Sequence, residues 1–343
     1  MANTIQNIRV IGAGIAGLTA AYEFARRGQN VELVDRNDGP GLGCSFHAGG
    51  MIAPWVEAES AEPLIVTLGL EALDYWTNTV AIATQNGSII VAPPRDRADL
   101  VRFERMTQER VMLDREGLRE IEPELADHFD RALYFPREAH LDPREAVKVI
   151  SDRLRAMPNV RMVFGQDAAT LSTSADWTID CRGLAARDVL TDLRGVKGEK
   201  FVVHAPDVHI SRACRMIHPR HPCYIVPRGN GQYMLGATMI ETEEPSRITV
   251  RSALELLGAA YTLHPSFAEA AIIEMGSDLR PAFADNLPRL RVIGRTIHIN
   301  GLYRHGYLVS PSLARMAADV ALTGAHYPEV MDEHHDQRHE ARG

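Results

Sequence analysis

The chain contains little cysteine. Its 343 residues include only Cys44, Cys181, Cys214 and Cys223, which form no CxxC pair and have no regular spacing. This pattern argues against a disulfide framework and against a zinc site, and it is typical of proteins in a reducing compartment. We therefore expect no metal ion in the functional site.

The sequence also lacks the features of a secreted, membrane-bound or nucleic-acid-binding chain. No apolar run approaches the roughly 20 residues that a membrane-spanning helix needs. The apolar stretch near the start has neither a basic region before it nor a cleavage site after it. The formal net charge is −8, which disfavours nucleic acid and anionic membranes as partners. We expect a soluble cytoplasmic protein without a membrane or nucleic-acid partner.

Apolar residues, in contrast, are plentiful. They make up 45% of the chain, and glycine and proline are ordinary in number at 26 and 19 residues. Disorder and a collagen-like structure are therefore excluded. At about 150 residues per domain, the chain has room for roughly two domains that each bury a core.

The first 35 residues have the pattern of a strand, a helix and a second strand. Residues 7–11 are an apolar strand, and the sequence GAGIAG follows at 12–17. Apolar residues then recur at helical spacing from Ile15 to Arg27. Residues 30–35 form a second strand, which ends on Asp35.

In this context GAGIAG predicts a dinucleotide-binding turn. Gly12 permits the tight turn, Gly14 lets the main chain approach a pyrophosphate, and Gly17 lets the helix pack closely on the strand. The helix N-terminus offers N–H groups and a partial positive charge to phosphates. Asp35 is placed to accept hydrogen bonds from ribose hydroxyls. The alternative is an ordinary glycine-rich turn of an α/β sheet.

The residues after Asp35 favour FAD over a nicotinamide cofactor. Segment 39–50 is rich in glycine and has no alternation of strand and helix patterns, as expected of main chain that wraps around a large cofactor. The sequence has no second glycine fingerprint to hold NADPH beside a flavin. A nicotinamide enzyme, which usually continues with plain strand–helix repeats, remains the alternative.

The rest of the chain alternates between helix and strand patterns and has no internal repeat. We assign the strands at 160–165 and 177–183 to the nucleotide-binding sheet and the hairpin at 223–239 to a separate antiparallel sheet. The other predicted elements are surface helices within 95–131, a helix from Pro143 to about Met157 capped by Asp142 and Glu145, a helix at about 249–260, a strand from Thr296, a helix that begins near Pro311, and a frayed polar tail from Tyr327.

Several longer segments resemble the D-amino acid oxidase-like flavoproteins, and within them the glycine oxidases of the thiamine pathway. The resemblance extends from about residue 7 to 325. Its most specific segments are HAGGMIAP (47–54), HLDPR (140–144), CYIVPRGNGQYMLGATM (223–239), LRPAFADNLP (279–288) and NGLYRHGYLVSP (300–311).

The resemblance implies an α/β fold of the D-amino acid oxidase and glutathione reductase-2-like type. A Rossmann-like FAD-binding domain would be joined to a discontinuous α+β substrate domain built on an antiparallel sheet. The expected FAD-binding domain comprises residues 1–55, 138–205 and 276–326. The expected substrate-binding domain comprises 56–137 and 206–275, and 327–343 would be a polar tail.

The resemblance also implies how the substrate is bound. Arg280 of the LRP motif would clamp the substrate carboxylate with its planar guanidinium fork, and the Tyr224 hydroxyl would reach the same carboxylate. Arg304 would lie near the flavin and the substrate, while Met51 and Met239 would line the substrate cavity. For each there is a structural alternative, namely an ion-paired arginine, a core tyrosine or a core methionine.

The same resemblance implies a cofactor site. Gly301 and Gly306 would let main-chain N–H groups approach the flavin, and the following helix would point its positive end at the ring; the alternative is an ordinary strand–helix turn. The full implied set is Gly12, Gly14, Ile15, Ala16, Gly17, Asp35, Arg36, Cys44, Ser45, Gly49, Gly50, Met51, Ala169, Gly183, Gly301, Tyr303, Arg304, His305, Gly306, Tyr307 and Leu308.

The implied activity is FAD-dependent oxidation of glycine or a similar small amino acid or amine. The imine product would hydrolyse to glyoxylate and ammonia or supply thiazole synthesis for thiamine, and oxygen as acceptor would yield hydrogen peroxide. A homo-oligomer is expected. The alternatives are a D-amino acid, sarcosine or proline dehydrogenase with another electron acceptor and, more remotely, a nicotinamide-dependent reductase or a nucleotide-binding module without a redox role.

Several absences and departures refine this expectation. FAD is expected to be noncovalent, because no cysteine follows Cys223. No Gly-Asp pair of the kind that aromatic hydroxylases use precedes the final helix, which disfavours monooxygenase chemistry. Pro222 stands where the glycine oxidases carry a histidine, with His221 one residue earlier, so the substrate preference stays open. The histidines at the end of the chain are expected to be solvated and not to bind metal; they are His334, His335 and His339.

Overall fold

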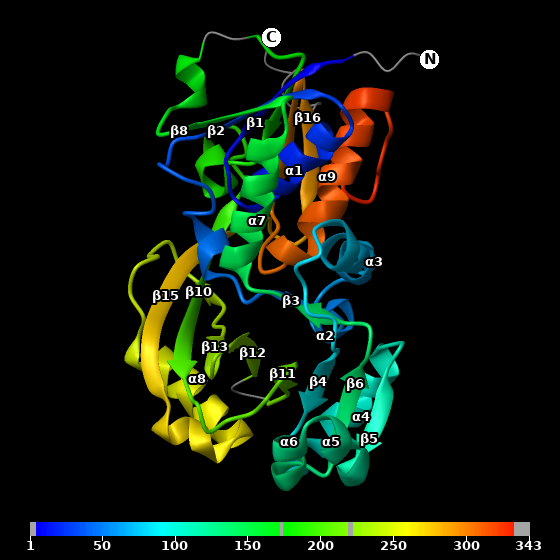
Figure 1. Cartoon of the computed structure of the whole chain (residues 1–343), viewed down its shortest axis with the longest axis vertical. Coiled ribbons are helices and arrows are strands. Elements are labelled where there is room, and N and C mark those ends of the chain that lie inside the picture. The colour runs from blue at the N-terminus through cyan, green and yellow to red at the C-terminus, as the bar shows by residue number, and fades with distance from the viewer. Residues whose placement is uncertain (1–4, 172–173, 219–221, 333–343) are drawn as a thin grey trace. The chain divides into compact units, whose positions relative to one another are not determined.

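The computed structural model describes residues 5–171, 174–218 and 222–332, which form two compact units (Figure 1). The first unit comprises Met1–Phe46, Arg144–Val196 and Arg280–Gly343, and the second comprises His47–Pro143 and Lys197–Leu279. Each unit is therefore assembled from separate stretches of the chain.

The first unit is built on a parallel sheet. Its described residues form six strands in the order β16-β17-β9-β1-β2-β8, in which only β16 runs antiparallel to its neighbour. The strands are β1 (Asn7–Ile11), β2 (Asn30–Asp35), β8 (Val160–Phe164), β9 (Trp177–Asp180), β16 (Arg289–Ile293) and β17 (Thr296–Asn300). The helices are α1 (Ile15–Arg26), α7 (Pro143–Ala156) and α9 (Gly306–Thr323).

The predicted strand–helix–strand unit at the start of the chain is confirmed. In β1 the apolar side chains of Ile8 and Val10 are buried, and the helical spacing in α1 buries residues such as Leu18 and Phe24. α1 packs beside α9 from the other end of the chain, as Figure 1 shows. The strands predicted at 160–165 and 177–183 also join this sheet, next to β2 and β1.

The second unit is built on a larger sheet. Its described strands follow the order β14-β10-β13-β12-β11-β4-β6-β5, and β15 also pairs with β10. They are β4 (Ser88–Val91), β5 (Val111–Asp114), β6 (Arg131–Phe135), β10 (Arg194–His204), β11 (Ala213–Met216), β12 (Cys223–Gly229), β13 (Gln232–Gly236), β14 (Ile240–Glu241) and β15 (Ala271–Ala282). A separate pair joins β3 (Met51–Ile52) to β7 (Ala139–His140).

Helices of the second unit flank these strands. They are α2 (Pro54–Glu57), α3 (Pro63–Asp74), α4 (Arg97–Met106), α5 (Arg115–Ile121), α6 (Pro123–His128) and α8 (Val250–Leu263). The helices expected within 95–131 and near 249–260 are therefore present. Thr249 caps α8, because its side-chain oxygen accepts a hydrogen bond from the Ser252 N–H.

The expected hairpin is confirmed as β12 and β13. Asn230 and Gly231 in its turn both have positive φ, as a tight two-residue hairpin turn requires. The sheet is not purely antiparallel, however, because β11 and β4 pair in parallel. The two strands are far apart in the sequence, so no local hairpin signal reveals their relative direction.

The unit boundaries differ from the expected domain boundaries. Residues 47–55, 138–143, 197–205 and 276–279 belong to the second unit. The reason is strand pairing within that unit: β3 pairs with β7, and β10 pairs with β13 over residues 200–204.

Two expectations about the end of the chain are wrong for the residues that the structure describes there. The final helix begins at Gly306, and Pro311 lies inside it near its N-terminal end. The residues from Tyr327 to Met331 are not frayed: Val330 is 1% exposed, and Leu290 in β16 forms a bridge with Met331. Apolar side chains between polar ones thus dock this segment on the sheet edge. His334, His335 and His339 lie outside the described residues, as does His221.

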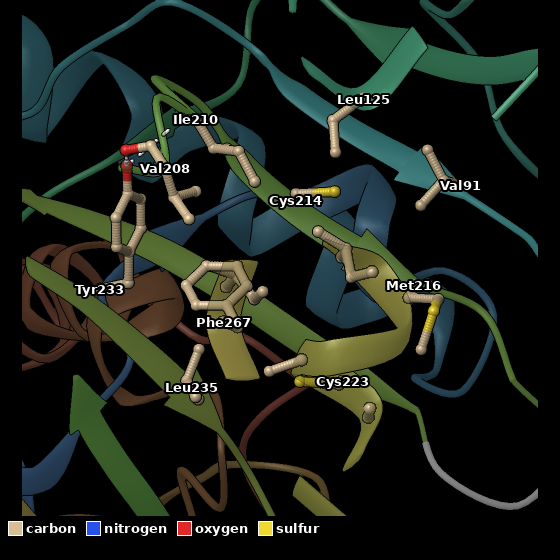
Figure 2. Packing of buried hydrophobic residues seen from close by; sticks show 14 of the residues in the cluster. Val91, Leu125, Val208, Ile210, Cys214, Met216, Cys223, Tyr233, Leu235 and Phe267 are labelled. Atoms are coloured by element: carbon tan, nitrogen blue, oxygen red, sulfur yellow. Dashed lines mark hydrogen bonds between the residues drawn. The ribbon is translucent and has the colours of Figure 1, made fainter. Parts of the chain in front are cut away.

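The largest apolar cluster described in the second unit includes the buried Tyr233. Figure 2 shows Tyr233 of β13 with its hydroxyl directed at Val208. That hydroxyl donates to the Val208 carbonyl oxygen at 2.5 Å and accepts from the Ile210 N–H at 3.2 Å, while the Phe267 ring lies edge-on at 5.4 Å. These bonds tie a loop to the sheet through its core.

Replacing this tyrosine should weaken the fold. We expect Tyr233→Phe to lower the free energy of unfolding by about 1–2 kcal/mol, because a buried N–H and a buried C=O lose their partner. Urea unfolding measures the change. Tyr261→Phe is the matched control, since Tyr261 is 55% exposed; equal stability of the two variants would contradict the role of the Tyr233 hydroxyl.

Candidate active site

The glycine-rich turn between β1 and α1 forms a cradle that side chains would fill. Gly12 has a φ of 98°, and a Cβ atom there would lie 2.6 Å from the Cys181 carbonyl oxygen. A Cβ atom at Gly17 would lie 1.7 Å from the Gly12 carbonyl oxygen. Only glycine therefore lets α1 start this close to β1, and this geometry suits a pyrophosphate at the helix N-terminus.

The start of α1 has no acidic residue and no capping side chain of its own. Instead the Ile15 N–H donates to the Ser45 hydroxyl at 3.0 Å, and the Tyr307 hydroxyl donates to the Ser45 carbonyl oxygen at 3.2 Å. Ser45 lies in the 3-10 turn Cys44–His47 and is buried. The first unit thus brings together Ile15, Ser45 and Tyr307, which were predicted from distant parts of the sequence.

Asp35 is fixed against the same turn. Its carboxylate accepts hydrogen bonds from the Ala13 N–H at 2.5 Å and from the Asn37 N–H at 2.8 Å. A carboxylate has about four acceptor directions, so these two bonds leave capacity for ribose hydroxyls. The neighbouring Arg36 is exposed, and Ala169 lies exposed in a 3-10 turn that follows β8.

The segment between β17 and α9 gathers further predicted residues. The Asn300 side chain donates to the Gly183 carbonyl oxygen at 2.9 Å and accepts from the Gly301 N–H at 2.8 Å. The Tyr303 N–H donates to the Pro281 carbonyl oxygen at 2.9 Å. This last bond ties the predicted cofactor segment to the residue that follows Arg280.

The two predicted arginines of the first unit have different settings. Arg280 is half-buried near the end of the long strand β15. The Arg304 guanidinium lies 6.0 Å from the centre of the Tyr303 ring. His305 immediately precedes α9, and Gly306, Tyr307 and Leu308 form its first turn.

A buried acidic residue that the sequence analysis did not single out supports the cradle. Asp180 ends β9; Arg182 Nε donates to its carboxylate at 3.0 Å, and His298 Nδ1 lies 3.2 Å from it. Burial alone would raise the pKa of Asp180, but the contacts with His298 and Arg182 outweigh it and hold that pKa at about 2. These contacts fix the loop that places Cys181 against Gly12. In the sequence, the signal that could have indicated Asp180 is its position as an acidic residue at the carboxyl end of a predicted strand of the parallel sheet.

In the second unit the Tyr224 ring lies close to two glycines. A Cβ atom at Gly49 would lie 2.7 Å from Tyr224 Cε2, and one at Gly236 would lie 3.0 Å from Tyr224 Cζ. Met51 and Tyr224 both pack on the cluster formed by Ala213, Val226 and Met234. The unit therefore brings together Gly49, Met51 and Tyr224.

Met239 has a different environment from Met51. It follows β13 just before the short strand β14, and its side chain is 49% exposed. The adjacent Thr238 hydroxyl donates to the Glu199 carboxylate at 3.0 Å and accepts from the Glu199 N–H at 3.0 Å. The main chain next to Met239 is thus fixed to β10.

The described residues lack features of some other site types. They contain no group of histidine, cysteine or acidic side chains suited to a metal ion. None of their helices combines the length and the apolar character needed to cross a bilayer. Pro222, where the resemblance leads us to expect a histidine, is exposed.

Fold and site together define a nucleotide-dependent oxidoreductase built from two units. The cradle at Gly12 and Gly17, the acid at Asp35 and the first turn of α9 fit the pyrophosphate, ribose and ring portions of a dinucleotide. The chain belongs to the FAD dependent oxidoreductase family, known as DAO, whose model matches residues 7–320. FAD is therefore its cofactor, and the nicotinamide alternative is excluded.

Individual relatives within this family are similar to the chain along almost its whole length. A Rhizobium etli protein with the provisional name thiamine biosynthesis oxidoreductase ThiO is 45% identical over 323 residues, which cover 94% of this chain and 98% of that protein. Glycine oxidase of Geobacillus kaustophilus is 25% identical over 355 residues, 92% of each chain.

Solved structures share the fold. A crystal structure of glycine oxidase from Geobacillus kaustophilus has a TM-score of 0.78 at 22% identity and covers 94% of this chain and 96% of that one. Iminodiacetate oxidase from Chelativorans sp. BNC1 has a TM-score of 0.78 at 23% identity, with the same coverage.

The cradle predicts a sharp requirement for glycine. Gly17→Ala should lower the affinity for FAD by roughly tenfold or more, because its Cβ atom would displace α1 from β1. The visible flavin absorption of the purified protein and titration of the apoprotein with FAD measure this. Gly258→Ala is the control, since a Cβ atom at Gly258 in α8 meets open space. Full flavin content in Gly17→Ala would contradict the cradle.

The Asp180 contacts predict a stability that depends on pH. Because the folded state lowers the pKa of Asp180, the ionised carboxylate stabilises the fold above pH of about 4, and this contribution disappears as the pH falls towards 2. Asp180→Asn should cost about 2 kcal/mol in free energy of unfolding at neutral pH and less near pH 3. Urea unfolding at constant saturating FAD tests this; a difference that does not shrink in acid would refute the role of the charge.

Proposed function

We propose that this protein oxidises glycine or a similarly small amino acid to its imine, which hydrolyses to glyoxylate and ammonia or supplies thiazole synthesis for thiamine. The observation that carries this proposal is the 45% identity to the ThiO protein of Rhizobium etli, which extends over almost the whole of both chains. The glycine oxidase of Geobacillus kaustophilus is 25% identical to this chain over 92% of both chains, and this similarity supports the same substrate class.

Arg280 is the proposed carboxylate-binding residue. Its guanidinium has two parallel N–H donors, which match the two oxygens of an amino acid carboxylate. The hydrogen bond from the Tyr303 N–H to Pro281 fixes the main chain next to Arg280. Its side chain can therefore hold the substrate in a constant orientation, which is the main contribution that a binding residue makes to this kind of oxidation.

Tyr224 is the proposed second donor to the carboxylate. Two glycines leave room for its ring, because a Cβ atom at Gly49 or at Gly236 would meet the ring. Met51 packs on the same apolar cluster as Tyr224. Arg304 and Met239 complete the proposed set of substrate residues, with Arg304 favouring the negative charge of the carboxylate.

The proposed FAD site consists of the turn after β1, Asp35, the Cys44–Ser45 segment, Gly49 to Met51, Ala169, Gly183 and residues 301–308. FAD, when bound, supplies the two-electron acceptor for the substrate α-hydrogen and passes the electrons on to oxygen, which gives hydrogen peroxide. The first turn of α9 offers N–H groups and a partial positive charge, which stabilise negative charge at the site. No side-chain base is required where the amine is neutral.

The remaining features of the proposal concern the setting of the enzyme. FAD is held noncovalently, since the chain has no cysteine after Cys223. Oxygen is the proposed electron acceptor, the proposed assembly is a homo-oligomer and the proposed location is the cytoplasm. The proposed FAD-binding domain includes residues 1–46, 144–196 and 280–326 of the first unit, and the proposed substrate domain lies within the second unit.

The carboxylate clamp predicts a defect confined to substrate binding. Arg280→Ala should raise the KM for glycine about 100-fold, because truncating a charged, hydrogen-bonded partner costs about 2–5 kcal/mol. Tyr224→Phe should raise the KM about tenfold, since it removes one hydrogen bond to a charged group. Peroxide formation and glyoxylate release measure both.

The matched control is Arg119→Ala, which removes an exposed arginine that pairs with Asp127. This control should keep the KM of the unmodified protein. Both site variants should retain the visible flavin absorption. An unchanged KM in Arg280→Ala would contradict the clamp, and loss of flavin from that variant would move Arg280 to the cofactor site.

A further inference from the structure

A buried arginine near the end of β12 holds the main chain of two other segments. Arg228 has a side chain that is 8% exposed, and its Nε lies 3.7 Å from Asp142 Oδ2. Its Nη1 donates to the Leu141 carbonyl oxygen at 2.6 Å, and its Nη2 donates to the Gly49 carbonyl oxygen at 2.7 Å and approaches that of Ala48 at 3.5 Å. One guanidinium therefore connects β12, residues 48–49 and residues 141–142.

The choice of arginine follows from this geometry. A buried cation is costly unless its donors are bonded, and here the partners are mainly backbone carbonyls. The position of the guanidinium therefore determines the path of the main chain at its partners, and it does not depend on which side chains those partners carry. Two nitrogens of a planar fork reach two different segments, which the single nitrogen of a lysine does not reproduce.

The neighbouring histidine does not share this charge. His140 of β7 is buried, and burial together with the positive charge of Arg228 lowers its pKa to about 4. The ring is uncharged near neutral pH. Arg228 thus supplies the positive charge at this place.

Arg228 thus holds the start of the segment formed by residues 48–56. A buried acidic residue, Glu138, holds the other end of this segment. Glu138 is 0% exposed; its Oε1 accepts hydrogen bonds from the Trp55 N–H at 2.6 Å and the Val56 N–H at 3.2 Å, and its Oε2 is bonded to the Ser88 hydroxyl. Burial, which the bonds from Ser88, Trp55 and Val56 oppose, raises its pKa to about 8. A protonated carboxyl group offers one acceptor oxygen and one O–H donor. The amide of a glutamine has the same shape and also offers one acceptor and one donor.

Between these two ends the segment is paired with residues 139–141. Met51 pairs with His140 in the β3–β7 ladder, and the Leu141 N–H donates to the Gly50 carbonyl oxygen at 2.8 Å. Gly50 has a φ of 76°, and a Cβ atom there would lie 2.1 Å from the Leu141 carbonyl oxygen. The main chain of residues 48–56 is thus fixed at its start, middle and end.

We propose that Arg228 and Glu138 are positioning residues that fix the main chain of residues 48–56 for catalysis. β12 contacts Gly49 twice, through the Tyr224 ring and through the Arg228 guanidinium, so Arg228 sets where Gly49 lies relative to Tyr224. Glu138 prevents the end of the segment from moving away. This inference rests on the proposed function, in which Gly49, Gly50 and Met51 belong to the active site.

Flavin-based measurements on the holoenzyme test the role of Arg228. Arg228→Met should shift the visible absorption spectrum of the bound flavin and weaken FAD binding by roughly tenfold or more, because the segment loses its anchor. Arg228→Lys should show the same shift to a smaller extent, and it carries the test if Arg228→Met does not fold. Arg119→Met is the control for loss of an arginine in the same unit. Spectra and FAD affinities of both Arg228 variants equal to those of the control would overturn the inference.

A matched pair of variants tests Glu138. Glu138→Gln should retain the flavin spectrum and the kcat for glycine, because its amide reproduces the acceptor and the donor. Glu138→Leu, of similar size, should shift the spectrum and lower kcat. Equal behaviour of the two variants would overturn the positioning role, since a residue that only fills space does not distinguish them.

The failure of this inference is distinguishable from that of the proposed function. Gly49→Ala tests the assignment of the segment, because its Cβ atom would displace the Tyr224 ring. An unchanged flavin spectrum in Gly49→Ala would contradict the assignment of the segment to the site. A shifted spectrum in Gly49→Ala with unchanged spectra in the Arg228 variants would overturn the positioning role alone.

Discussion

The close approach of helix α1 to strand β1 is the constraint on which the rest of the site depends. The main chain at Gly17 lies where a single added carbon would meet the Gly12 carbonyl oxygen. Because α1 starts so close to the strand, its first N–H groups point to the carboxyl edge of the parallel sheet. Asp35, at the end of the neighbouring strand, is bonded to the same turn through the Ala13 N–H.

The carboxyl ends of the parallel strands gather most of the proposed cofactor residues. β1, β2, β9 and β17 run in the same direction, and each is followed by a segment of the proposed FAD site or by a residue that supports it. A parallel sheet places such segments along one edge, which is the general location of ligands in α/β proteins. In the second unit the equivalent organising element is β12, which supplies both Tyr224 and Arg228.

The sequence predicted the elements whose signals are local. The strand, turn and helix around Gly12 and Gly17, and the hairpin around Asn230 and Gly231, depend on residue spacing and turn chemistry, and both are present. The predicted start of α9 is wrong because a proline is most frequent at the first position of a helix, whereas Pro311 is the sixth residue of α9 and lies inside it. The docked end near Val330 was missed because short apolar segments carry little periodic signal.

Contacts between distant segments could not be predicted from one sequence. Arg228 was part of a quoted motif, but its partners Leu141 and Gly49 lie far away in the chain, and no spacing rule connects them. The same holds for Asp180 with His298 and for Glu138 with Trp55. These buried polar groups are recognisable only once the fold shows which carbonyls and N–H groups need partners.

Mixing the holoenzyme with glycine in the absence of oxygen tests whether glycine reduces the bound flavin. We expect the visible flavin absorption to be lost as an equal amount of glyoxylate appears, and to return when air is admitted. A flavin spectrum that stays unchanged with glycine, with other small amino acids and with sarcosine would contradict this expectation.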